Sequence, residues 1–413
     1  MKDQIIAHLN DPGQLEKLYR SDKARFTRGF NSLYPEVRGN SIADFWNARL
    51  NYESDEIQFG SRREFLFVIG LAAIAGLIAK FPEIFRIDEE FFYPRNLGFI
   101  LFPALAAFFA WKNRLPAGKI AVIAGTMLAG LIFINTLPGN SGSDTLVLSC
   151  IHLVLFLWGI LGFTFVGGYR HDGEKRLGFL KYNGDLLVMT ALIMISAGLL
   201  TAITINLFSL IGLQIEEFYF KYIVIFGLPA APIFGTYLIR TNPQLVGKVS
   251  PVIAKIFSPL VLVMLVAYLG AMIYAGKDPY NDREFLMLFN VLLIGVMAII
   301  FFSVAETSGA KTRAEIWILF LLSLVTIVVN GIALSAIIFR IAEYGVTPNR
   351  AAVLGGNSLI LINLLLVTRQ LYRALFRDDE ITGVGNTIAR YLPVYICWTV
   401  VVTFLFPLIF GFQ

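Results

Sequence analysis

Cysteine, histidine and charge are all scarce in this chain of 413 residues. It has 2 cysteines and 3 histidines, and both cysteines, Cys150 and Cys397, lie within apolar runs. They form no Cys-x-x-Cys pair, which excludes a disulfide scaffold and a cysteine metal site, so we expect both to be small apolar side chains. Charged residues make up 15% of the chain, against about 25% in soluble domains.

The common motifs of soluble enzymes are also missing. The sequence has no P-loop, no dinucleotide-binding fingerprint, no His-Glu-x-x-His and no Gly-x-Ser-x-Gly. No polar stretch after residue 64 is long enough to form a soluble catalytic domain. A soluble enzyme is therefore excluded, and we expect no cofactor and no metal site. Any enzyme would have to build its site from the ends of membrane spans.

Hydrophobic residues, in contrast, make up 57% of the chain and are concentrated in long runs between short polar loops. Runs of this length are typical of transmembrane helices. We predict an all-α, polytopic membrane protein with a cytoplasmic helical segment at residues 1–64 and a transmembrane domain at residues 65–413. The eleven predicted spans are 65–85, 97–111, 120–136, 145–166, 186–211, 221–239, 251–275, 285–304, 316–339, 351–371 and 391–412.

The positions of the basic residues predict the orientation. If the N-terminal segment is cytoplasmic, most of the 34 Lys and Arg residues fall on the cytoplasmic side. By the positive-inside rule the N-terminus is then inside and, with an odd number of spans, the C-terminus is outside. A positive cytoplasmic face suits anionic lipid headgroups in the bilayer and is no evidence for nucleic acid.

The N-terminal segment predicts two amphipathic helices. Asp11-Pro12 is typical of a helix start, Pro35 and Gly39 end the first helical pattern, and Ser41 can cap the second helix. Apolar and aromatic residues recur at helical spacing between these points. We interpret the segment as a cap packed on the membrane face. The alternative is a docking module for a cytoplasmic partner protein.

Three acidic and aromatic loops indicate an internal repeat. The segments 84–89 and 338–343 are similar, and Glu216 lies halfway between Glu89 and Glu343. Four predicted spans separate each loop from the next, so the repeats would be parallel and arranged as 4+4+3. Chance similarity in a biased composition is the alternative. If the repeat is real, these three carboxylates could gate a common path.

Single charged residues near the span ends are further candidates for a polar path or gate. We expect Lys80, at the end of the first span, to extend outward to Glu83, and Arg340 has a similar place in the ninth span. His152, in the fourth span, could relay protons. The alternative for His152 is a hydrogen bond to a neighbouring helix.

Amides and hydroxyls are concentrated in the ninth and tenth spans, as Asn330, Asn357, Ser358 and Asn363. Together with Gly355-Gly356 they could form a helix break that exposes backbone groups to a ligand. Hydrogen bonding between helices and close packing by small residues is the alternative explanation.

The segment Tyr344-Gly345-Val346-Thr347-Pro348-Asn349-Arg350 follows the ninth span. It resembles a motif of a large uncharacterised family of polytopic bacterial membrane proteins, the domain of unknown function four-one-five-three. The segments 15–19 and 45–50 are similar to Bacteroides-type versions of that family. The resemblance implies a bacterial inner membrane and implies no particular activity.

The same segment makes a chemical prediction. Asn349-Arg350 is expected to cap the tenth helix, which places the Arg350 cation at the positive helix end. A compensating anion is therefore expected. It could be Glu343, another carboxylate of the outer loops or a bound anionic ligand, and we favour a carboxylate of the protein.

Three functions remain open from the sequence. The first is a transporter or permease-like protein that binds a small molecule or ion within the helical bundle. The second is a membrane signalling or scaffold protein whose N-terminal segment docks a cytoplasmic partner. The third is an intramembrane lipid-processing enzyme.

Overall fold

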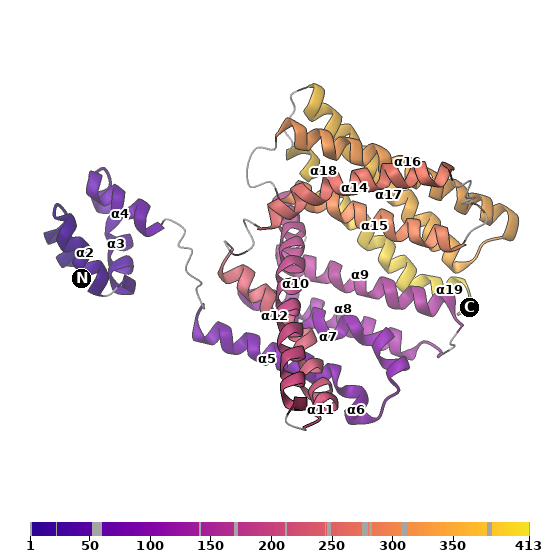
Figure 1. Ribbon diagram of the computed structural model, residues 1–413, viewed down its shortest axis with the longest axis horizontal. Coiled ribbons are helices and arrows are strands. Elements are labelled where there is room, and N and C mark those ends of the chain that lie inside the picture. The colour runs from indigo at the N-terminus through magenta and orange to yellow at the C-terminus, as the bar shows by residue number, and fades with distance from the viewer. Residues whose placement is uncertain are drawn as a thin grey trace. The chain divides into compact units, whose positions relative to one another are not determined.

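The computed structural model describes residues 2–21, 23–51, 60–139, 142–168, 172–210, 213–243, 245, 249–274, 280, 283–306, 312–377 and 382–412. Its regular elements in these ranges are all helices (Figure 1). The all-α fold class is therefore confirmed. The chain divides into two compact units, Met1–Gln58 and Phe59–Gln413, and each is described by itself.

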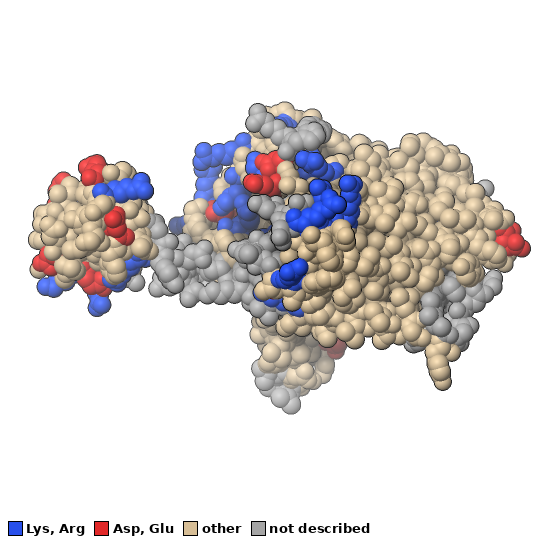
Figure 2. Space-filling view, turned by 90° about the horizontal axis from the view of Figure 1, so that it is seen from above, with Lys and Arg blue, Asp and Glu red and all other residues tan. Residues whose placement is uncertain are grey.

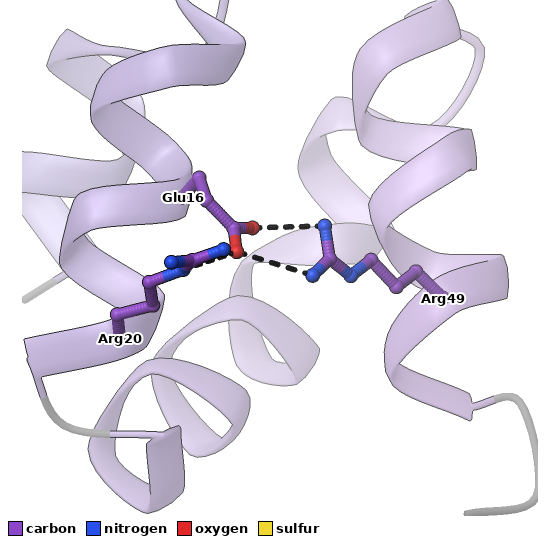
Figure 3. A network of polar contacts seen from close by, with 3 residues as sticks. All are labelled: Glu16, Arg20 and Arg49. Atoms are coloured by element: carbon purple, nitrogen blue, oxygen red, sulfur yellow. Dashed lines mark hydrogen bonds and ion pairs between the residues drawn. The ribbon is translucent and has the colours of Figure 1, made fainter.

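The N-terminal unit contains four helices around a core of its own. They are α1 (Lys2–Ala7), α2 (Pro12–Ser21), α3 (Lys23–Val37) and α4 (Ser41–Asn51). The buried core residues are Ile5, Leu15, Phe26, Phe30, Leu33, Ala43 and Trp46. On its surface, Glu16 accepts from Arg20 at 2.8 Å, and its second oxygen pairs with Arg49 at 2.8 Å (Figure 3). This network joins α2 to α4.

The helix starts of this unit confirm one prediction and correct two others. The Asp11 Oδ1 atom accepts from the backbone N–H of Gly13 at 3.0 Å, so the predicted cap of α2 is confirmed. Helix α3 continues through Pro35 to Val37, because a proline this near the C-terminus disrupts little of the remaining ladder. The cap of α4 is Asn40, not Ser41, since the Asn40 Oδ1 atom accepts from the Ile42 N–H at 2.9 Å.

The larger unit is a bundle of long helices joined by short connections (Figure 1). Its elements are α5 (Arg62–Ala79), α6 (Phe81–Phe85), α7 (Glu89–Lys112), α8 (Ala117–Thr136), α9 (Asp144–Val166), α10 (Gly173–Leu210), α11 (Glu216–Tyr219), the π-helix η1 (Phe220–Val224), α12 (Ile225–Thr241), α14 (Val249–Tyr274), α15 (Arg283–Ala305), α16 (Arg313–Tyr344), α17 (Pro348–Phe376), α18 (Thr382–Val400), the π-helix η2 (Val401–Leu405) and α19 (Phe406–Ile409).

Eight helices in the described part of the chain are long and apolar enough to cross a membrane. They are Glu89–Lys112, Ala117–Thr136, Asp144–Val166, Gly173–Asn206, Glu216–Thr241, Arg313–Tyr344, Pro348–Phe376 and Gly383–Ile409. Two shorter apolar helices, Lys255–Gly270 and Phe289–Ala305, coincide with predicted spans, and the first predicted span falls mostly on α5. A multi-pass membrane protein is therefore the class that this fold fits. The count of eleven spans and the orientation stay predictions.

Two apolar clusters form the interior of this bundle. The first is built mainly from α5, α7, α8, α9 and α12, and the second from α14, α15, α16, α17 and α18. Helix α10 contacts members of both sets and crosses the other long helices in Figure 1. In Figure 2, Lys and Arg side chains gather over one part of the larger unit, and a wide area in view carries almost no charged residue. Large apolar side chains are exposed along these helices, for example Leu187, Ile195 and Val263, and an uncharged, apolar surface suits contact with lipid.

The helix boundaries do not establish the predicted repeat. Helices α7 and α11 begin at Glu89 and Glu216, whereas the third segment, 338–343, lies near the end of α16. Among the helix contacts of the described residues, α7 packs mainly on α9, α12 packs on α5 and α10, and α17 packs on α16 and α18. The three helices therefore do not share one packing pattern. The 4+4+3 arrangement therefore stays a prediction from the sequence.

Candidate functional site

A chain of three asparagines crosses the second apolar cluster. The Asn330 Nδ2 group on α16 donates to the backbone oxygen of Asn357 on α17 at 3.0 Å. The Asn357 Nδ2 group in turn donates to the Asn290 Oδ1 atom on α15 at 2.8 Å. Asn330 is 0% and Asn357 4% exposed, so these polar groups are enclosed by three helices. The structure thus brings together two of the residues that the sequence singled out, and adds Asn290.

One end of this chain is not closed. The Asn330 Oδ1 atom is buried and has no hydrogen-bond donor. Its orientation is fixed, because only the Nδ2 group can face the carbonyl of Asn357. The amide oxygen is therefore a buried acceptor that the protein itself leaves unpaired, and such an atom costs about 1–3 kcal/mol relative to its hydrated state.

Asn363 lies about one and a half turns beyond Ser358 on α17, and its partner is on another helix than those of Asn330 and Asn357. Its Nδ2 group donates to the hydroxyl of Tyr395 on α18 at 3.0 Å, while its Oδ1 atom is also buried without a donor. Ser358 turns back to its own helix and donates to the Leu354 oxygen at 2.7 Å. Ser358 therefore takes no part in bridging helices.

The predicted helix break at Gly355-Gly356 is wrong. Helix α17 is continuous from Pro348 to Phe376. A Cβ atom at Gly355 would lie 2.1 Å from the Trp398 ring on α18. The glycine is needed for this close approach, which is the packing alternative, and it does not expose backbone to a ligand.

The three carboxylates of the predicted gate are all exposed. Glu89 is in the first turn of α7 and Glu216 in the first turn of α11, where the helix dipole favours a negative charge. Glu343 is in the last turn of α16. Within the described ranges, none of the three takes part in an ion pair. A gate built from them stays a prediction.

Lys80 takes the partner that the sequence predicts. Its Nζ atom pairs with Glu83 at 3.1 Å, and it also donates to the backbone oxygen of Lys221 in η1 at 2.9 Å. The ammonium lies 3.4 Å from the centre of the Tyr222 ring. These contacts satisfy the buried cation within the protein, so Lys80 acts in holding α5 to η1.

Arg350 and Thr347 have other roles than expected. The Arg350 Nη1 group donates to the backbone oxygens of Tyr344 at 2.9 Å and Gly345 at 2.7 Å. The anion expected for Arg350 is therefore replaced by carbonyls at the negative end of α16. The cap of α17 is Thr347, whose Oγ1 atom accepts from the Arg350 N–H, and not Asn349-Arg350.

His152 and Arg340 are not joined to the asparagine chain. The His152 Nδ1 atom bonds to the Leu148 oxygen of its own helix at 2.9 Å, and no bond from His152 to another helix is seen in the described residues. The Arg340 Nη1 atom is buried without an acceptor. Neither residue therefore extends the predicted path at its present position.

A separate pair of asparagines joins α7 and α8, two helices of the first apolar cluster. Asn96 on α7 donates to the Asn135 Oδ1 atom on α8 at 3.0 Å, and Asn135 donates to the Asn96 Oδ1 atom at 2.9 Å. Each Nδ2 group also donates to a carbonyl of its own helix. All four amide heavy atoms are satisfied, so this pair is closed.

Buried carboxylates occur at other helix ends. Glu64 at the start of α5 pairs with Lys112 at the end of α7, and Glu306 after α15 pairs with Lys181 on α10 at 3.2 Å. Within the described residues, no group of three His, Cys, Asp or Glu side chains could hold a metal ion. These ion pairs join helices that are distant in sequence.

No family model matches this chain, and no curated protein or solved structure is measurably similar to it. The resemblance to the domain of unknown function four-one-five-three therefore stays a prediction that rests on the residues 344–350.

Proposed function

We propose that this chain is a transporter-like membrane protein that binds a small polar molecule or a cation among α15, α16 and α17. The observation that supports this most directly is the buried Oδ1 atom of Asn330, which has no donor. A ligand with an N–H or O–H group, or a cation that an amide oxygen can coordinate, would supply the missing partner.

The chemistry of the asparagine chain suits such a ligand. Asparagine cannot gain or lose a proton, so the site would select by hydrogen bonding and size. The bond from Asn330 to the backbone oxygen of Asn357 holds the amide of Asn330 in one orientation. An acceptor fixed in this way does not have to reorganise when the ligand arrives.

Access by water is the property that tests this proposal without knowledge of the substrate. Cys150 and Cys397 would be replaced by alanine, and a single cysteine placed at position 330 or at position 329. Asn330 is 0% and Val329 1% exposed, so the two positions are equally buried on adjacent residues of α16. A water-soluble maleimide would then be applied to the protein in membrane vesicles.

We expect Asn330→Cys to react and Val329→Cys to remain unlabelled, because a solute pathway must admit water to the amide. If neither cysteine reacts, or if both react equally, a pathway at Asn330 is excluded and the asparagines act only in joining helices.

A partner-docking role for the N-terminal unit is the second candidate function. The unit buries its aromatic residues in its own core, while Phe45 is 62% and Ile6 50% exposed. A unit with its own core does not need a membrane face to bury these aromatics. Deletion of residues 1–58 would test it: normal membrane insertion and thermal stability support docking, and loss of the folded bundle supports a structural cap.

We also propose that the protein resides in a bacterial inner membrane with its N-terminus in the cytoplasm, where anionic lipids face its basic side. The gathering of Lys and Arg in Figure 2 and the positive-inside rule support this. A reporter that is active only outside the cytoplasm, fused after Gln413, should be active, and its inactivity would reject the orientation.

A further inference from the structure

Arg95 is a buried cation that the sequence did not single out. It lies in the second turn of α7 and is 5% exposed. Its Nη1 group donates to the backbone oxygen of Phe91 at 3.2 Å, and its guanidinium lies 4.1 Å from the centre of the Phe91 ring. The Nε and Nη2 atoms are buried and have no acceptor.

The two free nitrogens lie on the same edge of the guanidinium group. An edge of this kind donates two parallel hydrogen bonds to two oxygens of one oxyanion. Arginine keeps its charge under all ordinary conditions, so the cation cannot escape the cost of burial by losing a proton. An unpaired buried ion costs several kcal/mol, which makes an anionic partner the simplest compensation.

Among the described residues, no side chain supplies that partner. No ion pair joins Arg95 to a carboxylate in the described part of the chain. Asn96, the next residue, has both its polar atoms engaged with Asn135. A Cβ atom at Gly139 would lie 3.9 Å from the Nη2 atom, so Gly139 lies close to the free edge and has no side chain to offer.

The position of Arg95 along the helix favours a phosphate group. Arg95 is six residues beyond the first residue of α7, which is about 9 Å along the helix axis. If the first residue of α7 lies at the outer edge of the headgroup region, which is about 5–8 Å thick on each side of a bilayer, Arg95 lies close to the boundary with the apolar core. Arginine recognises phosphate with the same two-bond geometry that it uses for carboxylate.

We propose that Arg95 binds a phosphate group through its Nε and Nη2 atoms, at the end of the bundle where α7 and α9 begin. The phosphate belongs either to a lipid headgroup or to a free anionic solute, and the two sources share this chemistry. The site is on other helices than the asparagine chain, so it stands or falls independently of the proposed transport function.

The test uses the full chain, purified in a non-ionic detergent that contains no phosphate. One arm adds inorganic phosphate at constant ionic strength, with chloride as the reference anion. The other arm adds phosphatidylglycerol and measures bound lipid by native mass spectrometry. Thermal unfolding is recorded in both arms. The variants are Arg95→Lys, Arg95→Met and, as a matched control, Arg350→Met, whose arginine donates to carbonyls at the end of α16.

We expect the unfolding temperature of the wild-type protein to rise and saturate in at least one arm. Arg95→Lys should bind at least about tenfold more weakly, because it keeps the charge and loses the two-bond edge. Arg350→Met should bind like the wild type. Saturation by phosphate alone identifies a solute site, and saturation by lipid identifies a headgroup site.

Two results would overturn the proposal. The first is a wild-type protein that responds to neither ligand more than to chloride. The second is an Arg95→Lys variant whose binding equals that of the wild type in both arms. Because the first result needs only the wild-type chain, the proposal remains testable even if Arg95→Met fails to fold.

Discussion

The two halves of the bundle use asparagine in opposite ways. In the first half, Asn96 and Asn135 exchange hydrogen bonds and leave no amide atom unpaired. In the second half, Asn330 donates to the backbone of Asn357 and keeps a buried oxygen without a donor. The first arrangement closes on itself and joins two helices. The second ends on a free acceptor and can accept a ligand.

This difference teaches that the type of residue does not reveal its role in a membrane interior. In the sequence, Asn96 and Asn330 look alike, because each is an asparagine within an apolar helix. What separates helix joining from ligand binding is whether every donor and acceptor is matched. Matching depends on the neighbours that the fold supplies, so it can be judged only from the structure.

The closed pair should be the more sensitive of the two to mutation. Asn96→Leu removes two hydrogen bonds between α7 and α8 and leaves the Asn135 oxygen unpaired. At about 0.6 kcal/mol for each of the two interhelical bonds, plus about 1–3 kcal/mol for the unpaired oxygen, we expect a loss of about 2–4 kcal/mol. Unfolding of the purified protein in denaturing detergent would measure it.

The double variant Asn96→Leu, Asn135→Leu serves as the control for this prediction. It should recover part of the loss, because no polar atom is then stranded. Single and double variants that add without coupling would show that the two amides do not act as a pair.

The bond between Asn363 and Tyr395 is an intermediate case. Tyr395→Phe removes the only acceptor seen for the Asn363 Nδ2 group and preserves the shape of the ring. We expect a loss of about 0.6 kcal/mol, measured in the same detergent unfolding experiment. A larger loss than that of Asn96→Leu would contradict the ranking of closed over open contacts.

Removal of the open acceptor should change stability least among these buried sites. Asn330→Leu gives up one bond to Asn357 but also removes an unpaired buried oxygen, and these effects oppose each other. We expect a change of less than about 0.6 kcal/mol in the free energy of unfolding, measured in the same detergent experiment. A destabilisation like that of Asn96→Leu would mean that Asn330 only joins helices.

The smallest effect is expected in the N-terminal unit, where a closed polar network lies on the surface (Figure 3). The hydrogen bond from Arg20, with a further one from Arg49, lowers the pKa of Glu16 from its ordinary value of 4.5. Because the folded-state pKa is the lower one, this network stabilises the unit above pH 4.5, and the contribution is lost as the pH falls below 4.5 through the folded-state pKa.

Thermal unfolding of residues 1–58, expressed alone and followed by circular dichroism, would measure this. Glu16→Gln should flatten the acid side of the stability profile and leave the profile near pH 7 almost unchanged, as expected for an exposed ion pair. An identical acid loss in the variant would assign the pH dependence to other carboxylates.

The long helices of the bundle could be predicted from the lengths of the apolar runs, because a helix that crosses a bilayer needs apolar side chains along most of its length. The proximity of Asn330 and Asn357 could also be anticipated, since antiparallel neighbours bring their polar residues to one contact. The contact of Gly355 with Trp398 could not be predicted. Trp398 is on the next helix, α18, and the residues near Gly355 do not determine how α18 is rotated about its axis.

Arginines show the same limit. Arg95 and Arg350 both lie near helix starts, but only Arg350 stands out in the sequence. Arg350 reaches two carbonyls because the chain turns back at Gly345, whereas the guanidinium of Arg95 is buried and keeps an edge without an acceptor. Whether each guanidinium finds acceptors therefore depends on how the chain folds around it, which the local sequence does not show.

The two π-helices give the molecule a particular sensitivity to insertions and deletions. Each widened turn offers a carbonyl to another helix: the Lys221 oxygen in η1 accepts from Lys80 at 2.9 Å, and the Thr403 oxygen in η2 accepts from Ser149 at 2.9 Å. Deleting one residue there would restore an ordinary α-helix and leave the rotation of the following segment nearly unchanged, but it would close the widened turn that offers the carbonyl. The extra residue of each π-turn is therefore needed for the contact with Lys80 or with Ser149.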